Sequence, residues 1–350
     1  MLAVPDGVAG LTPKWLTEAL APSFPGTGVA SVRVRDVAGG TNTRCVVELA
    51  YASGHGPATV FVKLPGRLLH RLALGALGAW AAEARLAASG VALPVEAPAF
   101  FAGATDPRRL AAAVVMEDVT GRGGRPNSGI APLSPGEVSS GLRELASLHA
   151  AFLDRRLPAE LGHVRPWRLP ARWAPVSAAS LARGLARWAR LAPVEAAALR
   201  RAAGLRELER GFRSWATAAR TGPQTLLHGD PHPANTYSLP GGRTGFLDWQ
   251  LVRVGSFTHD VGYFLAGSLD PAVRRRLERD LLAAYLERLA ELGVAAPPSL
   301  DETWGRYRAC IAFGLGTWLH TIGAGSFQPA DVSCATLERF AAAYVELGPA

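Results

Sequence analysis

The spacing of hydrophobic residues changes near residue 120 of this 350-residue chain. Before that point the chain contains short runs with the two-residue alternation of β-strands, and after it come long runs with the three- and four-residue spacing of α-helices. The glycine-rich segment 121–126 lies at the change and is typical of a flexible connection. The pattern predicts two units, residues 1–119 and 120–350, and a fold of the α+β class.

The first unit is predicted to contain an antiparallel five-stranded sheet and a helix that interrupts the order of the strands. Three β-like runs joined by short turns form an antiparallel meander, and two more follow a long Ala- and Leu-rich helical run that ends at Gly90. The predicted strands cover residues 31–37, 45–51, 59–64, 95–101 and 110–116, and the predicted helices cover residues 12–21 and 72–88.

The second unit is predicted to be larger and mainly helical. A compact non-helical stretch, residues 225–249, interrupts the helical pattern and contains the strongest functional signal in the chain. The helical patterns cover residues 136–153, 176–189, 194–219, 258–268, 271–292, 301–319 and 331–346.

The composition excludes several classes of protein. Hydrophobic residues make up 49% of the chain and charged residues 19%, which is typical of a well-buried globular protein and not of a disordered one. No apolar run approaches the roughly 20 residues of a membrane-spanning helix, and residues 1–10 lack a basic region followed by an apolar one. The three cysteines are scattered and lack metal-ligand spacing. We therefore expect a cytoplasmic protein with no membrane partner, disulfide framework or zinc site.

The basic residues argue against nucleic acid as a partner. The formal net charge is +8, but the arginines are spread along the chain, and the cluster at 274–276 lies in a helical pattern, as on a solvated helix face. All but two of the 37 basic residues are arginine, the exceptions being Lys14 and Lys63. A lysine that persists in such a chain suggests a position where arginine cannot serve. The sequence does not indicate an oligomeric state.

Three polar residues of the non-helical stretch form a recognisable arrangement. Asp230 and Asn235 lie five residues apart, and Asp248 follows. Phosphoryl transfer needs one carboxylate to orient a hydroxyl group, and an amide oxygen plus a second carboxylate to hold magnesium against nucleotide phosphates. Each piece alone would also suit a structural role, as turn residues in a Pro-rich loop and a carboxylate at the end of a strand.

The same stretch resembles a known family. His228-Gly229-Asp230 with His232 and Asn235, followed by residues 247–250 (Leu-Asp-Trp-Gln), is similar to the aminoglycoside phosphotransferase and choline kinase-like superfamily. The Asp-Trp-Gln ending is most similar to its ecdysteroid-kinase-like and uncharacterised bacterial branches. The resemblance extends from about residue 37 to residue 260, and it implies a two-lobed protein-kinase-like fold, ATP, Mg²⁺ and transfer to a hydroxyl of a small molecule.

The resemblance implies a role for each residue of the motif. Asp230 would be the catalytic base, and Asn235 and Asp248 would hold the metal. Lys63, at the end of the third predicted strand, would contact the nucleotide phosphates. Glu83 on the next helix would pair with it, since a carboxylate on an apolar helix face needs a partner. The open alternatives are a strand-end charge for Lys63 and a solvated helix edge for Glu83.

Two further segments would bind the nucleotide according to the resemblance. The turn Gly39-Gly40-Thr41-Asn42 would cover the phosphates with its backbone amides, although a Gly-Gly pair also suits an ordinary hairpin. The hinge between the lobes would bind adenine through the backbone of Glu117 and Val119, with Met116 lining the pocket behind it.

Three residues are expected to position the catalytic loop instead of reacting. His228 is expected to pack beneath the loop and His232 to brace it by hydrogen bonds. In the family the equivalent of Asp260 fixes the loop backbone, while a plain helix-terminal carboxylate is the alternative. His149 matches a family pattern that has no assigned catalytic role.

The acceptor is expected to be a neutral or anionic hydroxylated small molecule, such as an antibiotic, nucleoside or sugar, and antibiotic resistance is one role that the resemblance implies. An aminoglycoside, being a polycation, would need an acidic cleft. The segment that builds the acceptor pocket in the superfamily is instead rich in tryptophan and arginine. The tryptophans are Trp167, Trp173, Trp188 and Trp215, and the arginines are Arg165, Arg168, Arg172, Arg183, Arg187 and Arg190.

A non-catalytic nucleotide-binding or scaffolding protein with the same fold is the alternative function.

Overall fold

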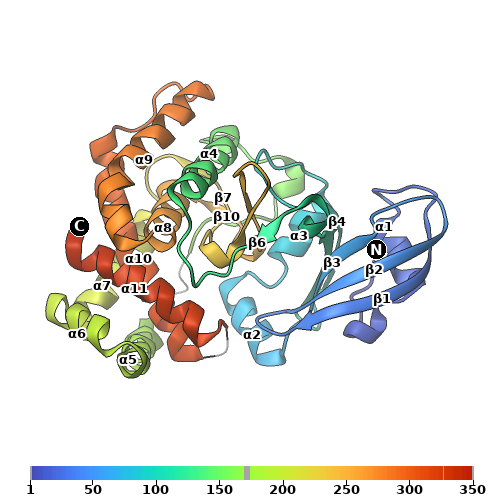
Figure 1. The fold of residues 1–350 in the computed structure, drawn as a ribbon, viewed down its shortest axis with the longest axis horizontal. Helices are drawn as coiled ribbons and strands as arrows, with labels where there is room; N and C mark the ends of the chain where they lie inside the picture. The colour runs from blue at the N-terminus through green and yellow to red at the C-terminus, as the bar shows by residue number, and fades with distance from the viewer. Residues whose placement is uncertain (1, 169–173, 326, 349–350) are drawn as a thin grey trace.

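The computed structural model describes residues 2–168, 174–325 and 327–348. A sheet-containing N-terminal lobe stands beside a larger helical C-terminal body, with helices α2 and α3 at the border between them (Figure 1). The α+β class and the two-lobed arrangement expected from the sequence are confirmed. Trp173 and Arg172, named above as acceptor-pocket candidates, lie outside the described residues.

The N-terminal sheet is five-stranded and antiparallel, in the order β1-β2-β3-β5-β4. Its residues alternate between two faces. Ala113 and Val115 of β5 pack in one core with helix α1, and Val114 and Met116 pack on the other side with helix α3. The strands are β1 (Gly28–Ala38), β2 (Thr43–Ser53), β3 (Thr59–Leu64), β4 (Phe100–Asp106) and β5 (Ala111–Glu117), and the first helix is α1 (Pro13–Leu20).

The single helix predicted over residues 72–88 is wrong, because the chain forms two helices there. Helix α2 (Leu68–Leu77) ends at Gly78, which adopts a left-handed conformation with φ 69°, and α3 (Ala82–Ser89) follows after a short turn. A glycine in this conformation ends a helix readily because it has no Cβ to clash. The break frees α2 to lie over the cavity between the lobes, while α3 stays on the sheet.

Two other predicted elements have different boundaries. The strand predicted over residues 95–101 begins only at Phe100, because Pro94 and Pro98 interrupt the segment and proline cannot donate a hydrogen bond to a neighbouring strand. The helix predicted over residues 194–219 is divided at Gly204 into α6 (Pro193–Ala202) and α7 (Leu205–Ala218). An internal glycine has low helix propensity, which accounts for the division.

The C-terminal lobe is built around α10 (Leu300–Ala324), which contacts α5, α7, α8 and α11. Its middle section, with Phe313, Leu315 and Trp318, is buried in the largest hydrophobic core. The other helices are α4 (Pro135–Phe152), α5 (Ala174–Leu191), α8 (Thr258–Ser268), α9 (Pro271–Glu291) and α11 (Ala330–Leu347).

The stretch predicted to be non-helical contributes strands to two small sheets, together with neighbouring segments. Strand β7 (Gln224–Leu227) pairs with β10 (Arg253–Ser256), and β8 (Thr236–Ser238) pairs with both β6 (Arg125–Pro126) and β9 (Thr244–Phe246). The loops that connect these strands carry the polar motif of the sequence. Short 3₁₀ turns complete the chain at Val8–Gly10, Val119–Arg122, Ala159–Leu161, Pro233–Asn235 and Trp249–Leu251.

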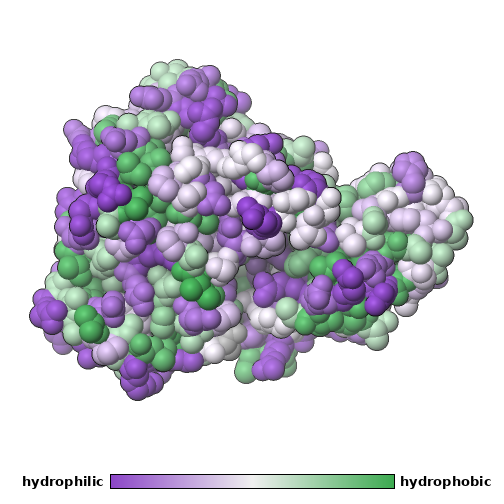
Figure 2. Space-filling view, in the orientation of Figure 1, coloured by the Kyte–Doolittle hydropathy of each residue, from purple (hydrophilic) through white to green (hydrophobic). Residues whose placement is uncertain are grey.

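The surface shows no broad apolar band in the view of Figure 2, where hydrophobic and hydrophilic residues are interspersed over both lobes. Within the described residues, no helix is both long and apolar enough to span a lipid bilayer.

Gly103 lets helix α3 approach the sheet closely. A Cβ at this position of β4 would lie 1.8 Å from the carbonyl oxygen of Ala84, which follows Glu83 in α3. We therefore expect Gly103→Ala to displace α3 and to lower the free energy of unfolding by about 1–3 kcal/mol, the usual cost of overpacking. Thermal and urea denaturation measure this change. Gly136→Ala, in open space near the start of α4, is the matched control and should not destabilise. Equal stability of both variants would contradict the close approach.

Candidate active site

The loop that follows β7 carries the first part of the motif. Gly229 has φ +86°, and a Cβ there would lie 2.1 Å from the carbonyl oxygen of Leu251, so the loop passes against the backbone that follows β9. Only glycine combines this conformation with this close approach. The loop continues through Asp230 into a short 3₁₀ turn, Pro233–Asn235, and both Asp230 and Asn235 line the same cavity.

Asp260, at the start of α8, holds the backbone of this loop in place. Its carboxylate accepts hydrogen bonds from the backbone amides of His228 (2.7 Å) and Gly229 (2.9 Å). His149 Nε2 lies 3.3 Å from the same carboxylate, and His149 Nδ1 lies 2.8 Å from the hydroxyl of Tyr285. Burial favours the neutral acid, but the hydrogen bond and charge interactions with His149 outweigh it and lower the pKa of Asp260. Asp260 is therefore an ionised residue that positions the loop.

The two histidines of the motif, which precede and follow Asp230 in the sequence, are both buried. His228 Nδ1 accepts a hydrogen bond from the Asp230 amide (3.2 Å), so His228 Nε2 carries the proton and donates to the carbonyl of Leu247 (2.8 Å). His232 packs edge-on against Trp318, and its Nε2 lies 3.7 Å from Asp230 Oδ2. Burial lowers the pKa of His232 to about 3, so this ring is neutral at pH 7.

Asp230 and Asn235 are in direct contact. Asn235 Nδ2 donates to the Asp230 carbonyl (3.0 Å) and to its Oδ2 (3.3 Å), and Tyr263 hydrogen-bonds to the same carboxylate. Burial and the neighbouring Asp248 charge raise the pKa of Asp230 to about 8. With this pKa most of the Asp230 carboxyl is protonated at pH 7, and its ionised form, which has a raised proton affinity, is the form that can accept a proton from a hydroxyl group.

Asp248 follows strand β9, which places it beside the loop that carries Asp230 and Asn235. The Leu247 amide donates to the Asn235 carbonyl (2.7 Å), which joins the two parts of the motif. Asp248 itself adopts a left-handed conformation with φ 63°, an uncommon state for a non-glycine residue. Its Oδ1 lies 3.0 Å from Lys63 Nζ. The Lys63 ammonium overcomes the effect of burial and lowers the pKa of Asp248.

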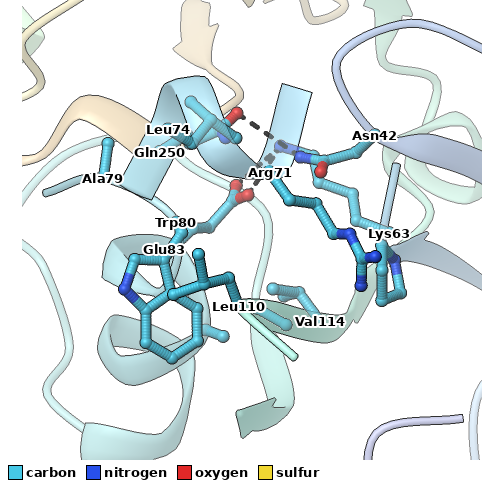
Figure 3. A pocket seen from close by; sticks show the side chains of 13 residues that line it. Asn42, Lys63, Arg71, Leu74, Ala79, Trp80, Glu83, Leu110, Val114 and Gln250 are labelled. Atoms are coloured by element: carbon cyan, nitrogen blue, oxygen red, sulfur yellow. Dashed lines mark hydrogen bonds and ion pairs between the residues drawn. The ribbon is translucent and has the colours of Figure 1, made fainter. Parts of the chain in front are cut away.

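Lys63 and Glu83 form a buried pair between the sheet and α3. Lys63 Nζ lies 2.8 Å from both carboxylate oxygens of Glu83, and each residue is only 5% exposed (Figure 3). Glu83 Oε1 also accepts a hydrogen bond from the Trp249 amide (3.0 Å). Burial alone would lower the pKa of Lys63, but Asp248 and Glu83 outweigh it and raise that pKa. The lysine is therefore a cation held by two carboxylates.

The glycine turn between β1 and β2 faces this cluster. The side-chain nitrogen of Asn42 donates a hydrogen bond to the side-chain oxygen of Gln250 (3.4 Å), across the opening drawn in Figure 3. The Gly40 carbonyl lies 3.0 Å from Nδ1 of His70 in α2. Thr41 lines the cavity beside Asp230 that is described below. The turn is thus tied to α2 and to the residue that follows Asp248-Trp249. Arg44 donates to the Gly39 carbonyl (3.5 Å).

The predicted hinge residues lie at the end of β5. Met116 is buried against α3 with Ala84 and Ala87, while the Glu117 carboxylate accepts hydrogen bonds from Arg122 (2.7 Å) and from the Ala99 amide (3.1 Å). Val119 begins the following turn. Met116, Glu117 and Val119 are absent from the described lining of the opening in Figure 3 and of the cavity beside Asp230, so their role in binding a nucleotide stays a prediction.

A cavity of about 300 Å³ lies between α2 and the C-terminal lobe, and the motif forms one of its walls. Three nonpolar residues of α2 and aromatic residues from several helices form the rest. The motif residues are Asp230, His232, Asn235 and Asp248; the other walls include Ala73, Leu74, Leu77, Trp167, Phe212, Tyr263, Phe313, Trp318 and Phe327.

The acceptor-pocket candidates divide into two groups. Trp167 and Arg168 line the cavity, whereas Trp188 and Trp215 are buried in the helical core. Three further lining residues, Tyr263, Phe313 and Trp318, were not predicted; they come from α8 and α10 and lie after the motif. Their helical spacing marks them only as buried residues, so the sequence contains no signal that distinguishes them from core.

The donor set fits the magnesium ion that the resemblance implies. Asn235 uses its amide nitrogen for hydrogen bonds, which leaves its side-chain oxygen available, and the Asp248 side chain is 30% exposed at the cavity. Amide and carboxylate oxygens are the hard ligands that Mg²⁺ prefers, and such a site usually takes only one or two protein carboxylates together with phosphate and water.

Solved structures with the same fold cover nearly the whole chain. A Ralstonia eutropha JMP134 protein classed as an aminoglycoside phosphotransferase matches with 16% identity over 95% of this chain and 97% of that one, with a TM-score of 0.52. Choline kinase from Cryptosporidium parvum Iowa II matches with 13% identity over 94% and 90%, with a TM-score of 0.50. A spectinomycin phosphotransferase, solved with ADP and spectinomycin, matches with 14% identity over 93% and 98%, also with a TM-score of 0.50. These likenesses confirm the kinase-like fold.

Sequence comparison identifies the family. No curated protein matches this chain. The model of the phosphotransferase enzyme family, however, matches residues 48–310, which include β3, α3, the catalytic-loop motif and most of the cavity wall. The resemblance seen in the motif is thereby confirmed, and the chain belongs to the phosphotransferase enzyme family.

Proposed function

We propose that the protein is an ATP- and magnesium-dependent kinase that transfers the γ-phosphoryl group to a hydroxyl of a small molecule. The observation that carries this proposal is the convergence of Asp230, Asn235 and Asp248 on one wall of a cavity, with Lys63 paired to Asp248 behind it. The same groups serve as base, metal ligands and phosphate contact in phosphoryl transfer.

Lys63 would hold the nucleotide phosphates. Its ammonium is fixed by Glu83, and Glu83 is fixed in turn by the Trp249 amide. A cation already in place before the reaction stabilises developing negative charge without reorganisation. The turn at residues 39–42 would cover the phosphates, and the backbone of Glu117 and Val119, with Met116 behind it, would bind adenine. In this proposal residues 1–119 form the nucleotide-binding lobe and residues 120–350 the catalytic and acceptor-binding lobe.

Asp230 would orient the acceptor hydroxyl and accept its proton. Its carboxylate faces the cavity and is held by Asn235 and Tyr263. His232 is the other titratable group beside it, but a neutral, buried ring 3.7 Å away is better suited to bracing the loop. Asn235 and Asp248 would hold Mg²⁺, which supplies neutralisation of phosphate charge when bound.

The acceptor would be neutral or anionic. Apart from Asp230 and Asp248, the described lining of the cavity beside the motif contains no carboxylate, and it includes Arg168 and Arg253. A polycationic acceptor would be repelled there.

The rival function is a nucleotide-binding or scaffolding protein without catalysis. Catalytic turnover distinguishes the two, because a scaffold would bind nucleotide but would not consume it in the presence of an acceptor. In this chain every position that the reaction needs holds a suitable side chain, which supports the enzyme.

The proposal is tested by screening hydroxylated metabolites and antibiotics for ATP consumption, with mass spectrometry to detect a phosphorylated product. We expect Asp230→Asn to bind ATP like the wild type but to turn over about 10²- to 10⁴-fold more slowly, because the missing base acts on the acceptor and not on the nucleotide. Near-normal turnover of Asp230→Asn would remove this residue from catalysis.

Lys63 provides a second test, because arginine should not replace it. The planar guanidinium is larger than an ammonium and cannot occupy the position where one nitrogen contacts both oxygens of Glu83 and one of Asp248. We expect Lys63→Arg to lower kcat/KM for ATP by about 10- to 100-fold through misplaced contacts. Lys14→Arg, on the exposed face of α1, is the matched control and should behave as the wild type. If all three proteins show the same kinetics, Lys63 is only a strand-end charge.

A further inference from the structure

Arg253 occupies a fixed position beside the catalytic loop. In the β7–β10 pairing it lies opposite Leu227, the residue before His228. The Trp167 amide donates to the Val254 carbonyl (2.7 Å), and the Val254 amide donates to the Arg165 carbonyl (3.0 Å), so segment 165–167 is tied to the same strand. Arg253 and Trp167 therefore form one rigid wall next to Asp230.

The guanidinium of Arg253 is only partly used by the protein. Its Nε donates to the Leu251 carbonyl (2.8 Å), and its Cζ lies 5.5 Å from the centre of the Trp167 ring. Within the described part of the chain, neither terminal nitrogen has a hydrogen bond or an ion pair. Asp230 and Asp260 attract this charge, but among the described residues no carboxylate forms an ion pair with the guanidinium. Burial lowers the pKa of Arg253 to about 10, which leaves it charged at pH 7.

A second cavity, of about 310 Å³, meets the first at this wall. It lies between the α2–α3 turn and segment 163–168, and both cavities share Leu77, Arg168, Gln250 and Arg253. Four arginines line it, and its described lining contains no carboxylate; these arginines are Arg85, Arg165, Arg168 and Arg253. None of the four forms an ion pair with a described residue. Arginines gathered without a counter-charge produce a positive potential that favours an anion.

The neighbouring polar groups do not weaken this potential. Burial, together with Arg85 and Arg165, lowers the pKa of His163 despite its hydrogen bond to a backbone carbonyl. In the first cavity, burial lowers the pKa of His320 to about 4, so this ring is neutral as well. The only carboxylates that face either cavity from the described residues are Asp230 and Asp248, and Asp248 is paired with Lys63.

We propose that the acceptor carries an oxyanion, a carboxylate, phosphate or sulfate, which Arg253 and Arg168 bind in the arginine-lined cavity while its hydroxyl-bearing, apolar part lies against Trp167 near Asp230. The inference rests on the proposed function, because it takes the first cavity, beside Asp230, as the place where the acceptor hydroxyl binds. A guanidinium presents paired N–H groups that match the geometry of an oxyanion. Arg253 is thus a specificity residue and not a catalytic one.

The test measures binding without nucleotide, using three benzyl alcohols whose para substituent is anionic, neutral or cationic: 4-(hydroxymethyl)benzoate, 1,4-benzenedimethanol and 4-(aminomethyl)benzyl alcohol. Calorimetry or ligand-observed NMR gives each affinity. We expect the wild type to bind the anion at least about 10-fold more tightly than the neutral diol, as expected for hydrogen bonds to a charged group, and to bind the cation most weakly.

Variants assign the preference to the proposed residues. Arg253→Gln should remove most of the preference for the anion and leave affinity for the neutral diol unchanged. Arg168→Gln, at an exposed position, should reduce the preference in the same direction and keeps the test available if Arg253→Gln proves unstable. Arg190→Gln, exposed at the end of α5 and outside both cavities, is the matched control.

Several outcomes would overturn the inference: tightest binding of the cation, a preference for the anion that survives both substitutions, or no binding of the benzoate at any soluble concentration. Phosphorylation of the neutral diol without a preference for the anion would overturn the anion site but retain the kinase. A preference for the anion that depends on Arg253, with no turnover of any acceptor, would support the site and contradict the kinase.

Discussion

The Lys63 ammonium, held between Glu83 and Asp248, is the interaction on which the rest of the site depends. It joins three parts of the chain: β3 of the sheet, helix α3 and the segment that follows β9. Because Lys63 and Glu83 are buried, removing the lysine would leave two neighbouring carboxylates without their counter-charge, at a cost of about 3–5 kcal/mol. The hydrogen bond from the Trp249 amide to Glu83 adds a direct connection from the N-terminal lobe to the catalytic segment.

A second buried network fixes the catalytic loop from the other side. It runs from Tyr285 through His149 to Asp260, and from Asp260 to the backbone amides of His228 and Gly229. Since these contacts hold backbone and not only side chains, they set where Asp230 points. The two networks meet at the cavity wall, so the groups proposed for catalysis are in place before a ligand binds. Preorganisation of this kind is the main source of catalysis in phosphoryl transfer, where the protein contributes position and charge.

The sequence predicted the sheet, the lobes and the motif because their signals are local. Alternation marks β3 and β5, and the spacing of Asp230, Asn235 and Asp248 identifies the loop and the strand that follows. The rarity of lysine singled out Lys63. The break at Gly78 could not be read from the pattern because the apolar stripe continues across it, and the alternation that predicted a strand from residue 95 is overridden by Pro98, so that β4 begins at Phe100.

The walls of the acceptor cavity could not be predicted in this way. Phe313 and Trp318 of α10 have the spacing of ordinary core residues, and only tertiary packing turns them toward Asp230. The same holds for Arg253, whose significance depends on its pairing opposite Leu227 and on the arginines of segment 163–168. The proposed acceptor site is thus assembled from segments that lie far apart in the sequence, and only the folded chain shows their convergence.

The central claim is that Asp248, held by Lys63, provides a magnesium site for the nucleotide. The most direct measurement is the affinity for ATP, with and without Mg²⁺, of the wild type, Asp248→Asn and the control Asp280→Asn, which changes an exposed carboxylate on α9. The account predicts that Mg²⁺ tightens ATP binding by the wild type and by Asp280→Asn, and that Asp248→Asn loses this response because a metal ligand is gone. An equal response to Mg²⁺ in all three proteins would contradict the account.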